Sequence, residues 1–395
     1  MTAATGTAIV SPTIESTTIR GKPQSRMAST WHLRPRSEWN FFQRTLVDMH
    51  AQALSNTADE STTKGDGASA LSTGSSGDGP TALAGEAPGA KAEFPPVFEH
   101  SDPVPVYSVL SQHRWVFPRA IAPLLANWLF SRGTGKCLPN WLAGGMYLIY
   151  FLWYGSDLFG HLQRMTHAYG FFDGHKPRDG IPDIEVAHVT LSLLAVIALR
   201  VTFAFSMLYG QTAEQQATML NWKWAAMLPL NAFVYACAID FWFYWYHRLM
   251  HEVPFLWQFH RKHHTTKHPI AALGSFADIE QELFDMLLIP LAAYLVWPID
   301  FPTWWVSTTY TLYIEAAGHS GLRAHFSNPV TSPYLGWIGC ALVIEDHDLH
   351  HRKGWKRATN YGKQTLLWDT LFGSKGERIE GVEGNVDWNQ RLKLL

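Results

Sequence analysis

The pattern of apolar and polar positions divides the chain into two regions of different character. None of positions 43–93 is aromatic, and 53–92 consists mostly of Ser, Thr, Gly, Ala and Pro with scattered charges. A segment of this kind buries too little apolar surface to offset the entropy that a chain loses on folding. We therefore expect residues 1–100 to form a largely disordered N-terminal region, interrupted by a short surface helix within 31–50.

Long apolar stretches dominate the second region, 101–395. They lie at 115–130, 141–159, 186–209, 224–246, 283–297 and 302–317. The third and fourth reach the roughly 20 residues that a helix needs to cross a bilayer. The others are shorter and fit tilted spans, re-entrant helices or core helices of a soluble protein, and the last two form a helical hairpin around the Pro298–Pro302 turn.

Composition and charge placement favour a membrane protein over a soluble all-α enzyme. Charged residues make up 16% of the chain, against about 25% in an average soluble domain. Arg200 and Asp240 interrupt the apolar stretches, and in a membrane bundle such residues face inward and are functional. The stretch 224–246 is followed directly by four basic residues: Arg248, Arg261, Lys262 and Lys267. Basic residues flank the cytoplasmic ends of membrane helices, so we place this end in the cytosol.

We accordingly predict an all-α integral membrane helical bundle, capped by a cytosolic helical domain. The formal net charge of -2 gives no attraction to nucleic acid. The three cysteines are far apart, which excludes a disulfide-stapled domain and a Cys-based zinc module. The first 30 residues lack an apolar stretch, so we expect no secretory signal, and an organellar transit peptide remains open.

Histidines carry the candidate chemistry. Eleven of the 19 lie between positions 247 and 351, and most fall in three short motifs. The motifs are His247-Arg-Leu-Met-His251, His260-Arg-Lys-His263-His264 and His347-Asp-Leu-His350-His351. A single histidine pair is more often a satisfied structural feature than a metal site, but solvated basic surfaces do not choose His over Lys and Arg three times.

The spacing within these motifs suits metal binding. Residues four apart on a helix share one face, so His247 and His251 can converge on one point. We expect the three rings of each HxxHH motif to reach one side as well. Eight imidazoles exceed the four to six positions around one transition ion and thus predict two ions. Imidazole suits Fe, Zn, Cu and Ni.

Further residues are candidates for supporting roles. Asp240 lies seven residues before His247 on the same helical face, and Glu345 and Asp346 precede the third motif. We predict that these carboxylates contact the imidazoles on the side that faces away from the metal. His319, at the end of the predicted hairpin, is a candidate ninth ligand. His268 and His325 are weaker candidates, and His188 is expected to be a buried, hydrogen-bonded side chain.

The three motifs, in this order after apolar helices, resemble the membrane-bound fatty acid hydroxylase/sterol desaturase superfamily. The tail Asn360-Tyr361-Gly362, followed by Trp368-Asp369-Thr370-Leu371-Phe372-Gly373, matches the ending of that family. The resemblance covers roughly 225–375. The run from Trp257 to Pro269 is most similar to fungal-type biosynthetic members.

This resemblance implies a bundle of about four transmembrane helices in the endoplasmic reticulum membrane, capped by a cytosolic, histidine-rich helical domain that holds a di-iron centre. It also implies O2 activation, with electrons from NAD(P)H through a donor such as cytochrome b5 or a reductase. The ligands that it implies are His247, His251, His260, His263, His264, His347, His350 and His351, and His319 matches an additional histidine of many members.

The chain departs from the family pattern in two respects. Many members carry His-Pro-x-Glu after the second motif, where this chain has Phe276-Ala277-Asp278-Ile279-Glu280. A ligand at that place is therefore lost or replaced by Asp278. No fused cytochrome b5 domain is recognisable in the apolar-poor first hundred residues, so the electron donor is expected to be a separate protein.

The function expected from these features is O2-dependent hydroxylation of a C–H bond in a lipophilic substrate: a lipid, a sterol or a terpenoid or polyketide metabolite. Desaturation on the same centre is the close alternative, because removal of a second hydrogen can replace hydroxyl transfer. A zinc-dependent membrane hydrolase and a non-catalytic membrane scaffold are alternatives from other classes.

Overall fold

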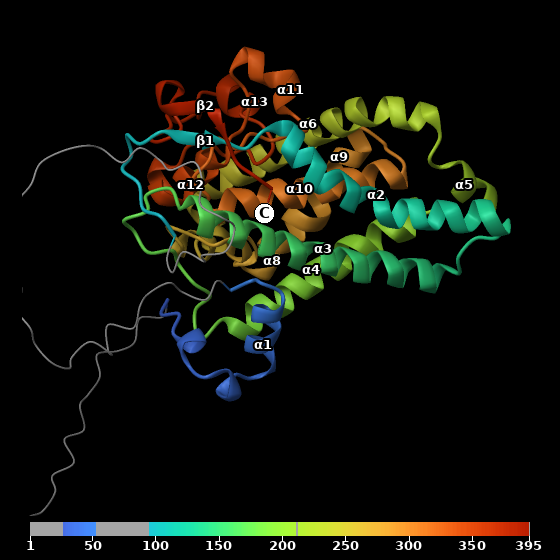
Figure 1. Ribbon diagram of the computed structural model, residues 1–395, viewed down its shortest axis with the longest axis horizontal. Helices are drawn as coiled ribbons and strands as arrows, with labels where there is room; N and C mark the ends of the chain where they lie inside the picture. Colours follow the sequence, from blue (N-terminus) through green and yellow to red (C-terminus); the bar gives the residue numbers. More distant parts are fainter. Residues whose placement is uncertain (1–26, 53–94, 211, 395) are drawn as a thin grey trace, which may run out of the picture.

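The computed structural model describes residues 27–52, 95–210 and 212–394, and these parts of the chain are mainly helical (Figure 1). Five long helices in them are α2 (Val109–Thr134), α3 (Asn140–Tyr169), α4 (Val186–Leu208), α6 (Trp222–Glu252) and α10 (Phe301–Ser320). The six apolar stretches all fall within helical segments. The low-complexity segment 53–92 lies outside the described residues, and the division at residue 100 stays a prediction.

Residues at the helix ends explain where two of the long helices begin. The Asn221 side chain accepts a hydrogen bond of 3.0 Å from the Trp224 amide at the start of α6. Asp300 accepts one of 2.9 Å from the Thr303 amide at the start of α10. Such side chains satisfy amides that have no partner within the helix. Gly321 ends α10 with a φ of 68°, a conformation that favours glycine.

The hairpin predicted around Pro298–Pro302 is present, and its first arm is irregular. This arm consists of α8 (Ile279–Leu283), a π-helical turn named η5 (Phe284–Leu288) and α9 (Ile289–Val296). Pro290 has no amide hydrogen, so the regular hydrogen-bond pattern cannot continue through it, and a wider turn precedes it. The second arm, α10, is the buried central helix and packs against α2, α3, α6 and the helix of the third histidine motif.

Two helices, α4 and α6, are long and apolar enough to cross a membrane by length and composition. The helices α2 and α3 contain 26 and 30 residues, enough to span at about 1.5 Å per residue. They carry more polar groups, including Arg119 and Asp157, which form an ion pair of 2.6 Å between them. The prediction of about four spans is therefore not confirmed.

The short helix expected within 31–50 is present as α1 (Phe41–Asp48), after the short turns η1 (Trp31–Leu33) and η2 (Arg36–Glu38). It packs against α4. Trp31 and Leu46 are fully buried in the common core, and the Trp31 indole donates a hydrogen bond of 3.1 Å to the Ile181 carbonyl. This segment is thus part of the packed structure and not a separate surface feature.

A two-stranded parallel sheet is a feature that the all-α prediction missed. It pairs β1 (Val104–Val106) with β2 (Val386–Arg391), far along the sequence. Hydrophobic patterning over so few residues does not distinguish a strand from a loop. The remaining elements are α5 (Ala213–Thr218), α7 (Pro254–His260), η3 (His263–Thr265), η4 (Ala271–Ser275), α11 (Ser332–Leu335), η6 (Gly336–Ile338), α12 (Ile344–Lys353), η7 (Trp355–Arg357), α13 (Leu367–Leu371) and η8 (Glu383–Asn385). In Figure 1 the sheet and α12 lie at one end of the molecule and α5 at the other.

Candidate metal centre

Nine buried histidines converge in the interior as two adjacent groups. Within each group, the ligating nitrogens all lie within 4.8 Å of one another. The five-histidine group consists of His247, His251, His260, His264 and His350. The four-histidine group consists of His263, His319, His347 and His351. The structure therefore brings together every histidine that the sequence predicted as a ligand, including the candidate ninth.

Helix geometry positions the first motif and His319. His247 and His251 lie one turn apart on α6, with ring centroids 5.1 Å apart. His319 lies in the last turn of α10, which ends two residues later at Gly321. Its ring centroid is 4.4 Å from that of His347 on α12. The end of the central helix thus supplies the histidine through which the hairpin contacts the third motif.

The three rings of each HxxHH motif, which we expected to reach one side, are divided between the two adjacent histidine groups. His264 belongs to the five-histidine group, while its neighbour His263 belongs to the four-histidine group. The third motif divides in the same way, with His350 in the first group and His351 in the second. Successive residues on a helix point about 100° apart, which explains the division on α12.

The Nδ1 atoms of seven of the nine histidines have an oxygen acceptor. Examples are His247 with the Tyr361 carbonyl at 2.8 Å and His350 with the Thr359 carbonyl at 2.8 Å. The same holds for His251, His260, His263, His319 and His351. A carbonyl oxygen only accepts, so Nδ1 must carry the proton. Each of these rings therefore turns the lone pair of its Nε2 toward the group.

The Nε2 atoms approach one another at distances that fit a shared cation. His247 and His260 are 2.9 Å apart at these atoms, and His319 and His347 are 3.0 Å apart. Two unprotonated lone pairs at this distance repel each other unless a positive charge lies between them. Ligands about 2.1 Å from one ion, at right angles, are about 3 Å apart. The residues present in both groups therefore fit transition-metal ions.

Burial also favours the neutral, ligating form of these rings. It lowers the pKa of His264 and of His350 well below the usual value, and neighbouring imidazoles lower it further. The pKa of His347 and of His351 is lowered well below the usual value by the same two causes. A metal binds imidazole without its second proton, so the interior prepares these side chains for coordination.

Comparison with known proteins agrees with this geometry. The family model for fatty acid hydroxylase matches residues 232–374, a range that contains all nine histidines. The chain is also 39% identical over 240 residues to the fatty acid hydroxylase vlmA of Lecanicillium sp. The aligned residues make up 59% of this chain and 66% of that protein. The chain belongs to the fatty acid hydroxylase family.

Other relatives match the chain at lower identity. Methylsterol monooxygenase 2-1 of Arabidopsis thaliana is 26% identical over 173 residues, 42% of this chain and 62% of that protein. Alkylglycerol monooxygenase of Xenopus tropicalis is 26% identical over 137 residues, 34% of this chain and 28% of that protein. The chain thus spans less than two thirds of the length of each of these curated relatives. No solved structure matches it significantly.

In this family member the predicted supporting carboxylates act through backbone segments and not on the imidazoles. Asp240 accepts hydrogen bonds from the amides of Lys363, Gln364 and Thr365 and from the Thr365 hydroxyl. It thereby fixes the segment whose Tyr361 carbonyl accepts from His247. The position of Asp240 on the α6 face was predicted correctly, but its partner is the loop after α12.

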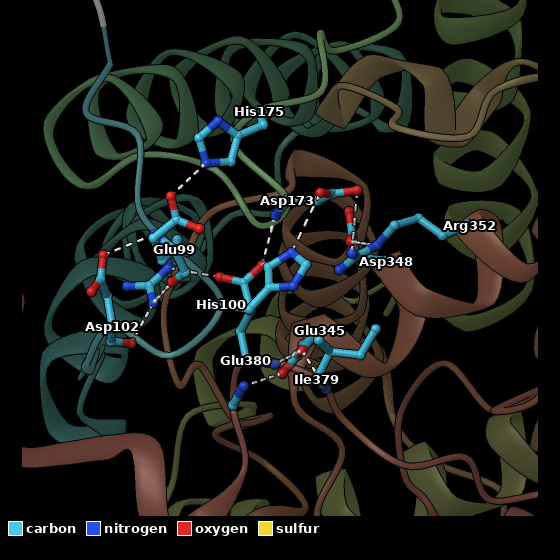
Figure 2. A network of polar contacts seen from close by, with 12 residues as sticks. Glu99, His100, Asp102, Asp173, His175, Glu345, Asp348, Arg352, Ile379 and Glu380 are labelled. Atoms are coloured by element: carbon cyan, nitrogen blue, oxygen red, sulfur yellow. Dashed lines mark hydrogen bonds and ion pairs between the residues drawn. The ribbon is translucent and has the colours of Figure 1, made fainter.

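Glu345 and Asp346 anchor α12 to the C-terminal segment. Glu345 accepts from the amides of Ile379, Glu380 and Gly381 at 2.7–3.0 Å (Figure 2). Asp346 forms an ion pair of 2.8 Å with Arg378. Figure 2 also shows Asp348, inside the third motif, paired with Arg352 at 2.7 Å. These contacts hold the backbone of the third motif in place.

Gln281 is a supporting residue that the sequence did not reveal. Its Oε1 lies 2.9 Å from His260 Nδ1 and accepts a hydrogen bond from it. The neighbouring Glu280 is exposed. Asp278 begins α8, with Oδ1 3.9 Å from the Lys262 amine, and belongs to neither histidine group. Glutamine has no pattern in the sequence that marks it as a partner of histidine.

The other candidate histidines lie outside both groups. His188 forms the expected hydrogen bond, from Nε2 to the Ala277 carbonyl at 3.0 Å, but is only half-buried. His268 lies 3.8 Å from Asp173, and the ring of His325 packs against Trp388 at 4.9 Å.

A mostly apolar cavity of about 720 Å³ meets the four-histidine group at His319. Its walls come from α3, α4, η4, η5 and α10, and include Phe151, Phe159, Leu193 and Ile197. A lining of this kind suits the body of a lipophilic ligand. It reaches the centre from the side of the candidate membrane helix α4.

Two stacked indoles lie beside the five-histidine group. Trp257 and Trp355 are 5.0 Å apart at their ring centroids and nearly parallel, at 7°. Trp257 also stacks on His264 at 5.7 Å. Both indoles are half-buried, and the neighbouring Lys356 is exposed. This group therefore adjoins the protein surface through aromatic rings, whereas the four-histidine group adjoins the cavity.

Proposed function

We propose that this protein is an O2-dependent hydroxylase that acts on a C–H bond of a lipophilic substrate with two iron ions. The observation that carries the proposal is the convergence of nine buried imidazoles in two adjacent groups. The names of the relatives, hydroxylase and monooxygenase, support the same reaction class. The five-histidine group would hold one ion and the four-histidine group the other.

Two iron ions, when bound, supply the electrons that activate O2 for attack on a C–H bond. The protein contributes orientation and exclusion of water. Backbone carbonyls hold the Nδ1 protons and so fix each ring. The apolar walls around Phe151 and Leu193 keep water from the side of His319 where the substrate is placed.

We further propose that the centre faces the cytosol from the endoplasmic reticulum membrane and that substrate enters from the bilayer. The basic residues after α6 support this orientation under the positive-inside rule. Electrons would come from NAD(P)H through a separate donor such as cytochrome b5. The half-buried stack of Trp257 and Trp355 supports delivery from the surface to the five-histidine group.

Desaturation remains the neighbouring reaction on the same centre, and zinc-dependent hydrolysis the alternative from another class. Metal analysis of the purified full chain, together with O2 uptake in the presence of NAD(P)H and a donor, distinguishes them. Two irons per chain, O2 consumption and an oxygenated product support the hydroxylase. An alkene product supports the desaturase, and zinc without O2 consumption overturns the proposal.

A further inference from the structure

The side chain of Arg200 is a buried charge that has no counter-ion in the part of the chain that the structure describes. Arg200 lies in α4, and only 6% of its surface is exposed. Among the described residues, its Nε has no hydrogen-bond partner and its guanidinium forms no ion pair. A guanidinium stays charged in proteins, and a buried charge is strongly destabilising when unpaired. An ionisable residue placed in this way within a candidate membrane helix marks a functional site.

Arg200 lines the cavity that leads to His319. It also lines a second, mostly apolar cavity of about 370 Å³ between α4, α6, η5, α9 and α10. Met286 of the π-helical turn lines both cavities as well. The two spaces therefore adjoin at Arg200 and Met286, on the side where α4 meets the hairpin. π-Helical turns are frequent at functional sites.

The other cation of the cavity is already neutralised. Lys363 lines the same space as Arg200, but its amine lies 3.4 Å from the buried carboxylate of Asp285 and 4.1 Å from the ring of Phe243. Glu315 also lines this cavity without reaching ion-pair distance to either cation. Of the two cations, Arg200 is thus the one left available to a ligand.

Resting on the proposed function, we propose that Arg200 binds an oxyanion of the substrate, for which a carboxylate is the simplest form. A guanidinium matches a carboxylate through two parallel hydrogen bonds. The apolar walls between Arg200 and His319 would hold the hydrocarbon body, so the anionic end is fixed at Arg200 and a distant carbon is presented at His319. Arg200 is then the residue that sets substrate class and orientation.

The test is a binding measurement on the full-length, metal-loaded protein in nanodiscs, with a 16-carbon fatty acid and its methyl ester as probes. Displacement of a fluorescent fatty acid gives a Kd for each. We expect the wild-type protein to bind the acid at least tenfold more tightly than the ester. Arg200→Gln should abolish this preference and leave the ester Kd within about twofold, because a hydrogen bond to a charged group carries that much affinity.

Three controls make the outcome decisive. Arg200→Lys keeps the charge and should retain part of the preference, and it replaces Arg200→Gln if that variant does not fold. Arg248→Gln removes a cation outside both cavities and should change neither Kd. Glu315→Gln removes the other acidic side chain that lines the cavity and should keep the preference for the acid. If Arg200 had a purely structural role, the acid preference would remain unaltered in all variants, including Arg200→Gln.

Equal binding of acid and ester by the wild-type protein, or an intact preference in Arg200→Gln, overturns the proposal. Neither result affects the metal content or the O2 uptake that test the proposed function. Loss of iron or of O2 uptake with an intact acid preference would instead overturn the proposed function and leave the binding site in place.

Discussion

The two histidine groups both consist of imidazole side chains, but their surroundings differ. The five-histidine group lies next to the Trp257–Trp355 stack and is supported by a side chain, Gln281, as well as by carbonyls. The four-histidine group has one imidazole fewer and reaches the apolar cavity through His319. One group adjoins the surface, and the other adjoins the space for a lipophilic ligand.

This difference favours separate roles for the two histidine groups, which the residue types alone do not reveal. Under the proposed function, electrons from a separate donor would be delivered where the Trp257–Trp355 stack reaches the surface. Substrate must be held where water is excluded, and the cavity meets only the four-histidine group. Variants that affect one group and spare the other therefore test whether the two are separate sites.

Removal of one ligand from each group should have the largest effect. We expect His260→Ala and His347→Ala each to reduce turnover at least about 100-fold, the upper end of what loss of an outer partner causes. Each variant should retain about one of two metal ions, measured by elemental analysis of the purified protein. His175→Ala, an exposed histidine outside both groups, is the control. Full metal content in either ligand variant would refute the assignment of its group.

Asp240→Ala should mainly reduce stability. The change leaves three buried amides and a hydroxyl without their acceptor, at a cost of about 3 kcal/mol or more. Thermal unfolding of the detergent-solubilised protein measures the loss. Asp48→Ala, which removes an exposed ion pair with Arg36, should change stability by less than about 1 kcal/mol. Equal unfolding temperatures in the two variants would contradict an anchoring role for Asp240.

Gln281→Leu should weaken metal binding in the five-histidine group alone. Without its acceptor, the ring of His260 is less firmly oriented, and such losses reduce metal affinity about 10- to 100-fold. Chelator competition on the purified protein measures this, and Gln281→Glu, which keeps an acceptor, should restore most of it. Gln258→Leu on the exposed side of α7 is the matched control. A weakened four-histidine group would show that the two sites are not independent.

Glu252→Gln should have the smallest effect, although Glu252 follows a ligand of the five-histidine group directly. Its pair with Arg248 is 2.7 Å long, but the carboxylate side chain is 50% exposed. Solvent screening limits such pairs to about 0.5 kcal/mol. Unchanged metal content and unfolding temperature are expected. A marked loss of either would mean that surface charge, and not the buried contacts, maintains this group.

The sequence predicted well which histidines lie together, because histidine identity and short spacing are local properties. The pair His247 and His251 follows from helix periodicity alone. The prediction of His319 as a ninth ligand also agrees with the geometry, since it lies where the hairpin ends. The helical stretches and the hairpin could be predicted for the same reason, because runs of apolar residues and prolines are local features of the sequence.

What the sequence did not predict depends on contacts between distant segments. The division of the third motif between two groups depends on how α12 packs against α10, and that of the second motif depends on the turn η3 that follows α7. The pairing of β1 with β2 joins residues nearly 300 positions apart, as between Val104 and Val386. Gln281 meets His260 only because α8 packs on α7. None of these arrangements has a local signature.

The adjacent residues His263 and His264 supply different groups, and so do His350 and His351. Consecutive Cα atoms are about 3.8 Å apart and cannot be separated. Two peptide bonds therefore connect the two histidine groups directly, so a shift of one group also displaces the other. An inserted or deleted residue in either motif should therefore disrupt both histidine groups at once. The two groups can be retained or lost only together.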